Sequence, residues 1–252
     1  MYKILAKSFF VGKRTVFMPS CHSTNEVASD LLKKGPIEDG TLIITDNQTK
    51  GRGQQGNSWE SRPGQNLTFS IVLKPHALTI NDHFHLNIIS SLAIKSYVNT
   101  VCPLKVFVKW PNDIYVGTEK IAGILISNIL RSNYIVNSII GIGLNINQTD
   151  FSVQNATSLK LCSGVGYSLP ESLELLVLEI EKYYFKWKRG EINDLVKEYQ
   201  DSLYWKDEVH TFLADNNYFT GIIRGINNAG QLHIERENDH AFFNFKEVSF
   251  IE

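Results

Sequence analysis

A chain of 252 residues, 43% of them hydrophobic and 20% charged, has the composition of a globular protein with one large domain and room for a small second one. Its 25 Lys and Arg residues balance 26 Asp and Glu residues, so it lacks the basic excess typical of DNA-binding proteins. No apolar run reaches the roughly 18–20 residues that a membrane-spanning helix needs. We therefore expect a soluble cytoplasmic protein that binds neither DNA nor membranes.

Near the N-terminus, Ser23 and Glu26 have the spacing of a capping box, and the segment 33–36, Lys-Lys-Gly-Pro, is typical of a helix end. We predict a helix between them, followed by a buried strand at Thr41–Thr45 and a second strand with alternating side chains at Leu67–Leu73. The twenty-one residues between these strands, 46–66, contain one large apolar side chain, Trp59. Structureless connections of this length are usually functional or disordered, so this loop is the first candidate for a site.

Apolar residues at helical spacing predict a second helix over 84–98. Four strand-like runs follow at 105–110, 114–116, 121–130 and 134–142, and short turns separate them. Because parallel strands need a long crossover, these turns indicate antiparallel pairing.

Ser168 and Glu171 repeat the capping spacing before a helix that ends near Gly190, and another helix runs to about Leu203. Five short strands follow, at 209–213, 218–225, 231–236, 241–245 and 248–251. The sequence predicts an α+β protein. Residues 1–204 would form a mixed, largely antiparallel sheet flanked by helices, and residues 205–252 a small SH3-like β-barrel.

The segment 51–56 matches the glycine pattern G-x-G-x-x-G of dinucleotide-binding proteins. That motif must open a helix, which residues 57–64 cannot form, and a P-loop would need a lysine where Asn57 stands. Glycines still let backbone N–H groups approach an anion, and Arg52 offers a planar donor to a phosphate or carboxylate. A surface loop with incidental glycines is the alternative.

A second candidate is the segment 109–113, Lys-Trp-Pro-Asn-Asp, with Lys120 seven residues beyond it. These side chains are suited to phosphates and a hydrated Mg²⁺, although an exposed hairpin would also explain them. Lys120 opens an otherwise apolar strand, where an ammonium group is costly unless it meets an anion. This favours the functional interpretation.

Two further segments carry weaker signals. The three small polar residues 23–25 offer donors at a helix N-terminus, although a plain capping box needs no function. Gly141 and Gly143 end a strand where a ligand could press against the backbone, or where a β-bulge could form. No zinc motif, kinase motif or G-x-S-x-G is present, and the widely spaced Cys21, Cys102 and Cys162 indicate no disulfide framework.

Taken in order, Ser-Thr-Asn, Gln-x-x-Gly-Arg-Gly, Lys-Trp-Pro-Asn-Asp, Lys-x-Ala-Gly-Ile-Leu and Gly-x-Gly-x-Asn resemble the biotin protein ligase family. The resemblance covers roughly residues 20–150. It implies a class II synthetase-like catalytic domain, with an SH3-like domain after it. It also implies that biotin and Mg·ATP form biotinyl-5′-AMP, and that biotin then passes to one lysine of a biotin carboxyl carrier domain, such as that of acetyl-CoA carboxylase.

The same resemblance assigns roles to individual residues. The residues that it implies for biotin are Ser23, Thr24, Asn25, Gln48, Gly51, Arg52, Gly53, Gln54, Lys120, Gly141 and Gly143. Those that it implies for ATP and its phosphates are Arg52, Trp59, Lys109, Asn112, Asp113 and Lys120. Lys120 and Arg52 would be catalytic, and Asp113 would hold Mg²⁺ through water. Cations at these places suit the reaction, because joining a carboxylate to a phosphate brings negative charges together.

This chain departs from the family pattern in its loop, which has Gln54, Gln55 and Asn57 where many members have basic residues. We expect the adenylate to leave faster as a result. Twenty-two residues precede Ser23, too few for a winged helix, so we expect no repression by direct DNA binding. The alternatives are a lipoate or octanoate ligase and a non-catalytic biotin-binding regulator. The protein would be a monomer, or a homodimer paired through exposed strands beside Gly141.

Overall fold

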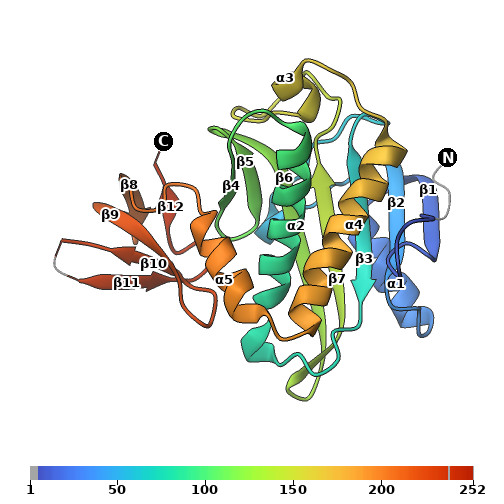
Figure 1. Ribbon diagram of the computed structural model, residues 1–252, viewed down its shortest axis with the longest axis horizontal. Helices are drawn as coiled ribbons and strands as arrows, with labels where there is room; N and C mark the ends of the chain where they lie inside the picture. The colour runs from blue at the N-terminus through green and yellow to red at the C-terminus, as the bar shows by residue number, and fades with distance from the viewer. Residues whose placement is uncertain (1–4, 238, 252) are drawn as a thin grey trace.

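The computed structural model describes residues 5–237 and 239–251, apart from the side chain of Gln55, and contains two sheets (Figure 1). The strands of the large sheet are β1 (Thr15–Cys21), β2 (Thr41–Gln48), β3 (Leu67–Leu73), β4 (Val106–Lys109), β5 (Asp113–Val116), β6 (Glu119–Arg131) and β7 (Tyr134–Leu144). Their order in space is β1-β2-β3-β7-β6-β5-β4. Only β1 and β2 pair in parallel among these seven strands, so the predicted mixed, largely antiparallel sheet is confirmed.

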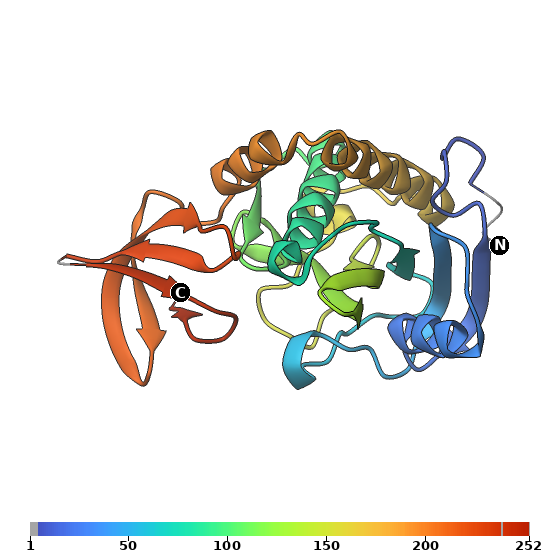
Figure 2. The same ribbon diagram turned by 90° about the horizontal axis from the view of Figure 1, so that it is seen from below.

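Helices cover both faces of this sheet, as Figure 2 shows. On one face lie α2 (His85–Val101), α4 (Leu169–Lys188) and α5 (Ile192–Asp201), and on the other lies α1 (Thr24–Lys34). The strands supply both cores by alternation: Leu42 and Ile44 join the main core, whereas Ile43 between them packs with Ala28 of α1. Helix α1 packs against β2, β3 and β7, and a cleft opens beside it on the same face.

The two predicted capping boxes have different outcomes. At α4, the Ser168 hydroxyl accepts a hydrogen bond from the Glu171 N–H, as predicted. At α1, Ser23 is the N-cap residue but its side chain makes no capping hydrogen bond, so that prediction is wrong. The Gln48 side-chain oxygen instead accepts the Thr24 N–H at 3.0 Å, and this contact joins the end of β2 to the start of α1.

Two elements were not predicted from the sequence. Strand β1 contains Pro19, which lowers strand propensity in the interior of a sheet but is tolerated at an edge, where β1 lies. Helix α3 (Leu159–Ser163) is a single short turn with Ser158 as its N-cap. The prediction that strands beside Gly141 are exposed for pairing is also wrong, because Gly141 pairs with Ser70 and Leu125 inside the sheet. The edges of the described sheet are β1 and β4.

The C-terminal strands form a second, antiparallel sheet in the order β11-β10-β9-β8-β12. Its strands are β8 (Val209–Ala214), β9 (Asn217–Ile226), β10 (Leu232–Glu235), β11 (His240–Phe243) and β12 (Ser249–Phe250). The Trp110 indole donates to the Gly230 carbonyl at 2.9 Å, and its ring packs against Phe245. The second sheet is thereby held beside the β4–β5 turn. The predicted boundary after residue 204 stays a prediction.

A buried carboxylate on α4 holds the segment that precedes β1. Glu181 is 4% exposed and accepts the N–H groups of Phe9, Phe10 and Val11 at 2.6–2.7 Å. Glutamine keeps one oxygen, so the Phe9 N–H would then face an NH₂ group. We expect Glu181→Gln to lower the free energy of unfolding by about 2 kcal/mol in urea titrations. Glu179→Gln, a control on the same helix, should cost under about 0.5 kcal/mol, and equal losses would contradict this prediction.

Candidate active site

A cleft of about 690 Å³ opens on the α1 face of the large sheet, where α1, β3, β5, β6 and β7 meet the loop 49–66. The predicted site residues that line it are Ser23, Thr24, Asn25, Gln48, Arg52, Gly53, Gln54, Trp59, Asn112, Asp113, Lys120, Gly141 and Gly143. Gly51 and Lys109 are the predicted residues that do not line it in the described part of the chain. The fold thus brings four separate sequence segments to one cavity.

The floor of the cleft is made of glycine. Along β7, Ile140, Ile142 and Leu144 belong to the main core, so Gly141 and Gly143 face the opposite side. A Cβ at Gly143 would lie well inside van der Waals contact with the Trp59 indole, and one at Gly141 would collide with the Asn25 side chain. Gly123 of β6 pairs with Gly143 and also lies under the indole. Because these positions of β6 and β7 have no side chains, a flat group can lie directly against the backbone of the sheet.

At one end of the cleft, buried Ser70 of β3 connects the polar residues of α1. Its hydroxyl oxygen lies 2.7 Å from the Thr24 hydroxyl and 2.5 Å from the Asn25 side-chain oxygen. The Asn25 amide donates to the Leu125 carbonyl at 3.1 Å, which fixes its orientation. These groups form a set of oriented donors and acceptors at the N-terminus of α1, an arrangement suited to a small polar ligand.

Lys120, near the start of β6, forms an ion pair with Asp113 of β5 at 2.6 Å. Both side chains are about one-third or less exposed, and the ammonium lies 5.7 Å from the centroid of the Trp59 ring. The Lys120 backbone donates to the Asn155 carbonyl at 2.8 Å and accepts from the Thr157 N–H at 2.9 Å. The segment 155–157 therefore fixes the backbone of this lysine at the edge of the cleft.

The other residues of the predicted phosphate motif have structural contacts. The Asn112 amide donates to the Ile124 carbonyl, and the Ile124 N–H donates back to the Asn112 carbonyl at 3.0 Å. The Lys109 ammonium lies 3.2 Å from the Tyr115 hydroxyl and 5.2 Å from the centroid of the Phe250 ring. Lys109 therefore packs beside the cleft, against an aromatic group that includes a C-terminal residue, and its role at a phosphate stays a prediction.

The loop that carries Arg52 folds back on itself. The Trp59 N–H donates to the Gly51 carbonyl at 3.0 Å, and the Gly53 N–H donates to the Asn57 carbonyl at 2.6 Å. A side chain at Gly51 would collide with the Trp59 carbonyl, so this turn requires glycine. Arg52 forms an ion pair with Glu26 in the first turn of α1. Within the motif, Gln54–Gly56 forms one 3₁₀ turn and no α-helix, which agrees with the rejection of a dinucleotide-binding motif.

Sequence reasoning missed several residues that line or support the cleft. Asn145, the last residue of Gly-x-Gly-x-Asn, is 3% exposed, and its side-chain oxygen lacks a hydrogen-bond partner in the described structure. Its amide donates to the Thr157 carbonyl at 2.9 Å, so the free oxygen offers an acceptor to a ligand with an N–H or O–H group. The motif contained this residue, but its buried acceptor is a tertiary feature.

Lys246 also lines the cleft, although it comes from the C-terminal part of the chain, outside the large sheet. It occupies the turn after β11 with a φ of 66°, a left-handed conformation that is uncommon for lysine. Packing of Phe245 on Trp110 brings this turn to the cleft. Its position depends on contacts far apart in sequence, so no local pattern could predict it.

Among residues 5–237 and 239–251, no three His, Cys, Asp or Glu side chains come together as a metal-binding group. No helix in this part of the chain combines the length and the apolar character that crossing a bilayer requires.

Comparison with known proteins identifies relatives of this chain. The sequence model of the Biotin/lipoate A/B protein ligase family matches residues 17–145. The bifunctional ligase/repressor BirA of Bacillus spizizenii is 30% identical over 183 residues, which are 71% of this chain and 56% of that protein. The biotin–[acetyl-CoA-carboxylase] ligase of Mycobacterium tuberculosis is 27% identical over 84% of this chain and 80% of its own. The chain thus spans little more than half of the BirA relative.

Solved structures agree with the sequence comparison. The biotin protein ligase of Aquifex aeolicus in complex with biotin and ATP superposes with a TM-score of 0.78 at 25% identity, over 94% of this chain and 98% of that one. The biotin protein ligase of Leishmania major in complex with biotinyl-5-AMP gives 0.63 at 22% identity, over 92% and 98%. The second likeness concerns the fold alone.

Proposed function

Because this chain belongs to the biotin/lipoate A/B protein ligase family, we propose that it is a biotin protein ligase. It would join biotin to ATP as biotinyl-5′-AMP with release of pyrophosphate, and then transfer biotin to a lysine of a biotin carboxyl carrier domain with release of AMP. The observation that carries this proposal is the convergence of the predicted motifs on one cleft. That set includes the Gly-Arg-Gly loop and Lys-Trp-Pro-Asn-Asp, which favour biotin over lipoate.

The two ends of the cleft suit the two substrates. The oriented polar groups around Thr24, Asn25 and Ser70 match the several donors and acceptors of a ureido ring. The glycine floor then gives a flat path towards Lys120 for an acyl chain. Beyond Lys120, the free Asn145 oxygen and Lys246 offer an acceptor and a cation to a nucleotide. Biotin would therefore bind at the α1 end and ATP towards the C-terminal sheet.

Lys120 and Arg52 supply the positive charge that the first step needs. The biotin carboxylate must approach the α-phosphate closely, and a preorganised ammonium stabilises the negative charge that gathers at their junction in the transition state. In the structure each cation forms an ion pair with a carboxylate, Lys120 with Asp113 and Arg52 with Glu26. We propose that the substrates' negative charges take over these contacts during the reaction.

The donor set at the cleft fits Mg²⁺ that arrives with ATP. This ion is usually held by one or two carboxylates together with substrate phosphates and water. Asp113 offers such a carboxylate beside the lysine. Mg²⁺ would neutralise charge on the phosphates, and Asp113, once the substrates have taken over Lys120, would hold the ion through water.

The glutamine at position 54 of the loop, where many family members have a basic residue, should affect how long the adenylate stays bound. Gln54 lines the cleft, so an arginine there adds a charge-assisted hydrogen bond to a phosphate. We expect Gln54→Arg to slow dissociation of biotinyl-5′-AMP by about tenfold, the effect of a bond worth roughly 1.5 kcal/mol. Stopped-flow dissociation rates provide the measurement. Gln65→Arg adds the same charge outside the cleft and serves as the control, and equal rates in wild type and Gln54→Arg would contradict the prediction.

The proposal is tested by incubating the purified protein with ATP, Mg²⁺, a carrier domain and either biotin or lipoate. A biotin ligase adds biotin to the carrier and exchanges pyrophosphate into ATP only when biotin is present. Transfer of lipoate would instead identify a lipoate ligase. Binding of biotin without exchange or transfer would identify a regulator. We expect the reaction to occur in the cytoplasm, where ATP and carboxylases are found.

A further inference from the structure

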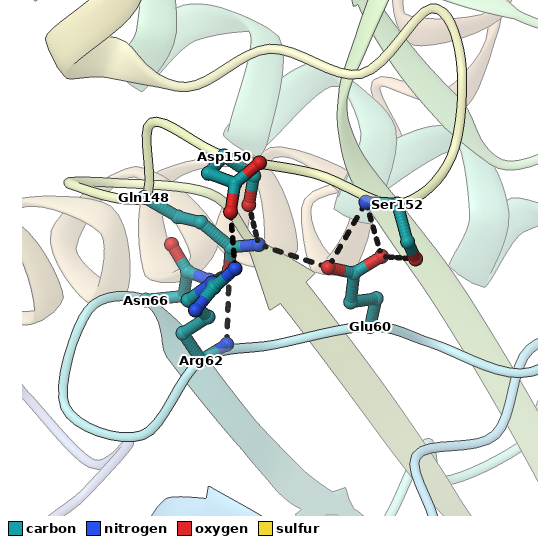
Figure 3. Close-up of polar contacts among 6 residues, drawn as sticks. All are labelled: Glu60, Arg62, Asn66, Gln148, Asp150 and Ser152. Atoms are coloured by element: carbon teal, nitrogen blue, oxygen red, sulfur yellow. Dashed lines mark hydrogen bonds and ion pairs between the residues drawn. The ribbon is translucent and has the colours of Figure 1, made fainter.

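Six polar residues join the two loops that border the cleft, as Figure 3 shows. One loop connects β2 to β3 and contributes Glu60, Arg62 and Asn66. The other follows β7 and contributes Gln148, Asp150 and Ser152. We call these six residues the two-loop cluster. None of them was predicted as a site residue, and they carry no role in the proposal above.

Gln148 is the fixed centre of the two-loop cluster. It is fully buried, and its side-chain oxygen accepts from the Arg62 N–H at 2.9 Å and from the Asn66 amide at 2.6 Å. Its side-chain nitrogen donates to the Asp150 carbonyl at 2.8 Å. The C-terminal part of the β2–β3 loop is therefore anchored to the loop after β7, while the part that carries Arg52 and Trp59 lies at the cleft.

Glu60 makes a further contact across to the second loop, on the side of the cluster that faces the cleft. Its carboxylate accepts the Ser152 N–H at 3.0 Å and the Ser152 hydroxyl. Both residues line the cleft, whereas the other four members of the cluster do not. Glu60 directly follows Trp59, and Ser152 lies three residues before Asn155, whose carbonyl accepts the Lys120 N–H. A continuous path thus connects the indole over the glycine floor to the backbone of Lys120.

We propose that Glu60 is a positioning residue: it couples the Arg52–Trp59 loop to the segment that fixes Lys120, and so keeps the cleft closed around the acyl adenylate. The inference rests on the proposed function. Glu60 would act through Ser152 and would not contact the reacting atoms. A mixed anhydride reacts with water, so a closed pair of loops protects it until the carrier arrives. The carboxylate suits this task, because its hydrogen bonds to two donors of one residue are charge-assisted.

The proposal predicts a coupled effect of two substitutions. Glu60→Gln removes the charge and turns one donor-facing oxygen into an NH₂ group, and we expect biotinyl-5′-AMP to dissociate about tenfold faster. Ser152→Ala, which keeps the N–H and loses the hydroxyl, should show a smaller increase. The double variant should match Glu60→Gln alone, because residues in one contact are not additive. Asp150→Asn is the control: it makes the same chemical change at an exposed ion pair with Arg62.

A second measurement does not need activity. Hydrogen exchange of the ligand-free protein should be faster in Glu60→Gln for peptides covering both 51–60 and 151–157, and unchanged in Asp150→Asn. The inference is overturned if only the 51–60 peptides respond, if adenylate retention stays within about twofold of wild type, or if the two substitutions act independently. If the wild type forms no adenylate, the proposed function fails, whereas coupling between the loops is still decided by exchange.

Discussion

Replacing Lys120 with alanine is expected to slow biotinyl-5′-AMP formation by about 10²–10³-fold, as loss of one preorganised charge partner usually does. The ammonium reaches into the cleft between Asp113 and the Trp59 ring, and its backbone is fixed by the segment 155–157. Alanine leaves Asp113 without its partner, and the two anionic substrates then meet no cation there. Biotin-dependent pyrophosphate exchange at saturating substrates measures the step.

The matched control is Lys105→Ala, which removes a lysine that lies outside the cleft lining, with its ammonium over the Phe107 ring. Exchange should stay within about twofold of wild type, because such exposed contacts contribute little. A Lys120→Ala variant with near-normal exchange and an unchanged melting temperature would remove this residue from the chemistry. Such a result would contradict the proposed mechanism, which depends on this ammonium group. It would leave the family assignment unchanged, because that assignment depends on the sequence match.

The regular elements were accessible from local sequence. Strand β3 has the predicted bounds, Leu67–Leu73, and the helices α1, α2, α4 and α5 lie where periodicity and stop signals placed them. These signals work because a core-facing stripe and a helix end are encoded by neighbouring residues. Strand β1 was not predicted, because its own residues carry a weak strand signal. It is stabilised by parallel pairing with β2, which follows it in sequence only after helix α1.

The cleft could be predicted in part, because the family motifs mark most of the residues that line it. What the motifs could not supply are the contacts between distant segments. Ser70 is an unremarkable strand serine in the sequence, yet it connects Thr24 and Asn25. Glu60 contacts Ser152, which is 92 residues away in sequence, and Lys246 reaches the cleft from a turn of the second sheet. Each of these positions depends on how loops are anchored, which local patterns do not encode.

The glycine floor provides the second large expected effect: Gly143→Val should reduce kcat/KM for biotin by about 100-fold, since displacement of a site group by an ångström can cost that much. The new Cβ would collide with the Trp59 indole, and the valine methyl groups extend further into the cleft. The indole must then move, and with it the Arg52 loop, which is joined to Trp59 by the hydrogen bond from the Trp59 backbone N–H to the Gly51 carbonyl. Pyrophosphate exchange and calorimetric titration with biotin would measure the loss.

We expect the Gly143→Val variant to fold normally, so that a loss of activity would report on the cleft and not on stability. Gly143 lies inside β7, paired with Thr68 and Gly123, and valine is a strong strand former. Circular dichroism should therefore be unchanged. Gly166→Val, at a position outside the cleft lining where an added Cβ meets only Asn147 at 3.6 Å, is the matched control and should keep normal activity. Normal biotin turnover in Gly143→Val would mean that neither the indole nor the acyl chain rests on this strand, and the proposed path from the α1 pocket to Lys120 would have to run elsewhere.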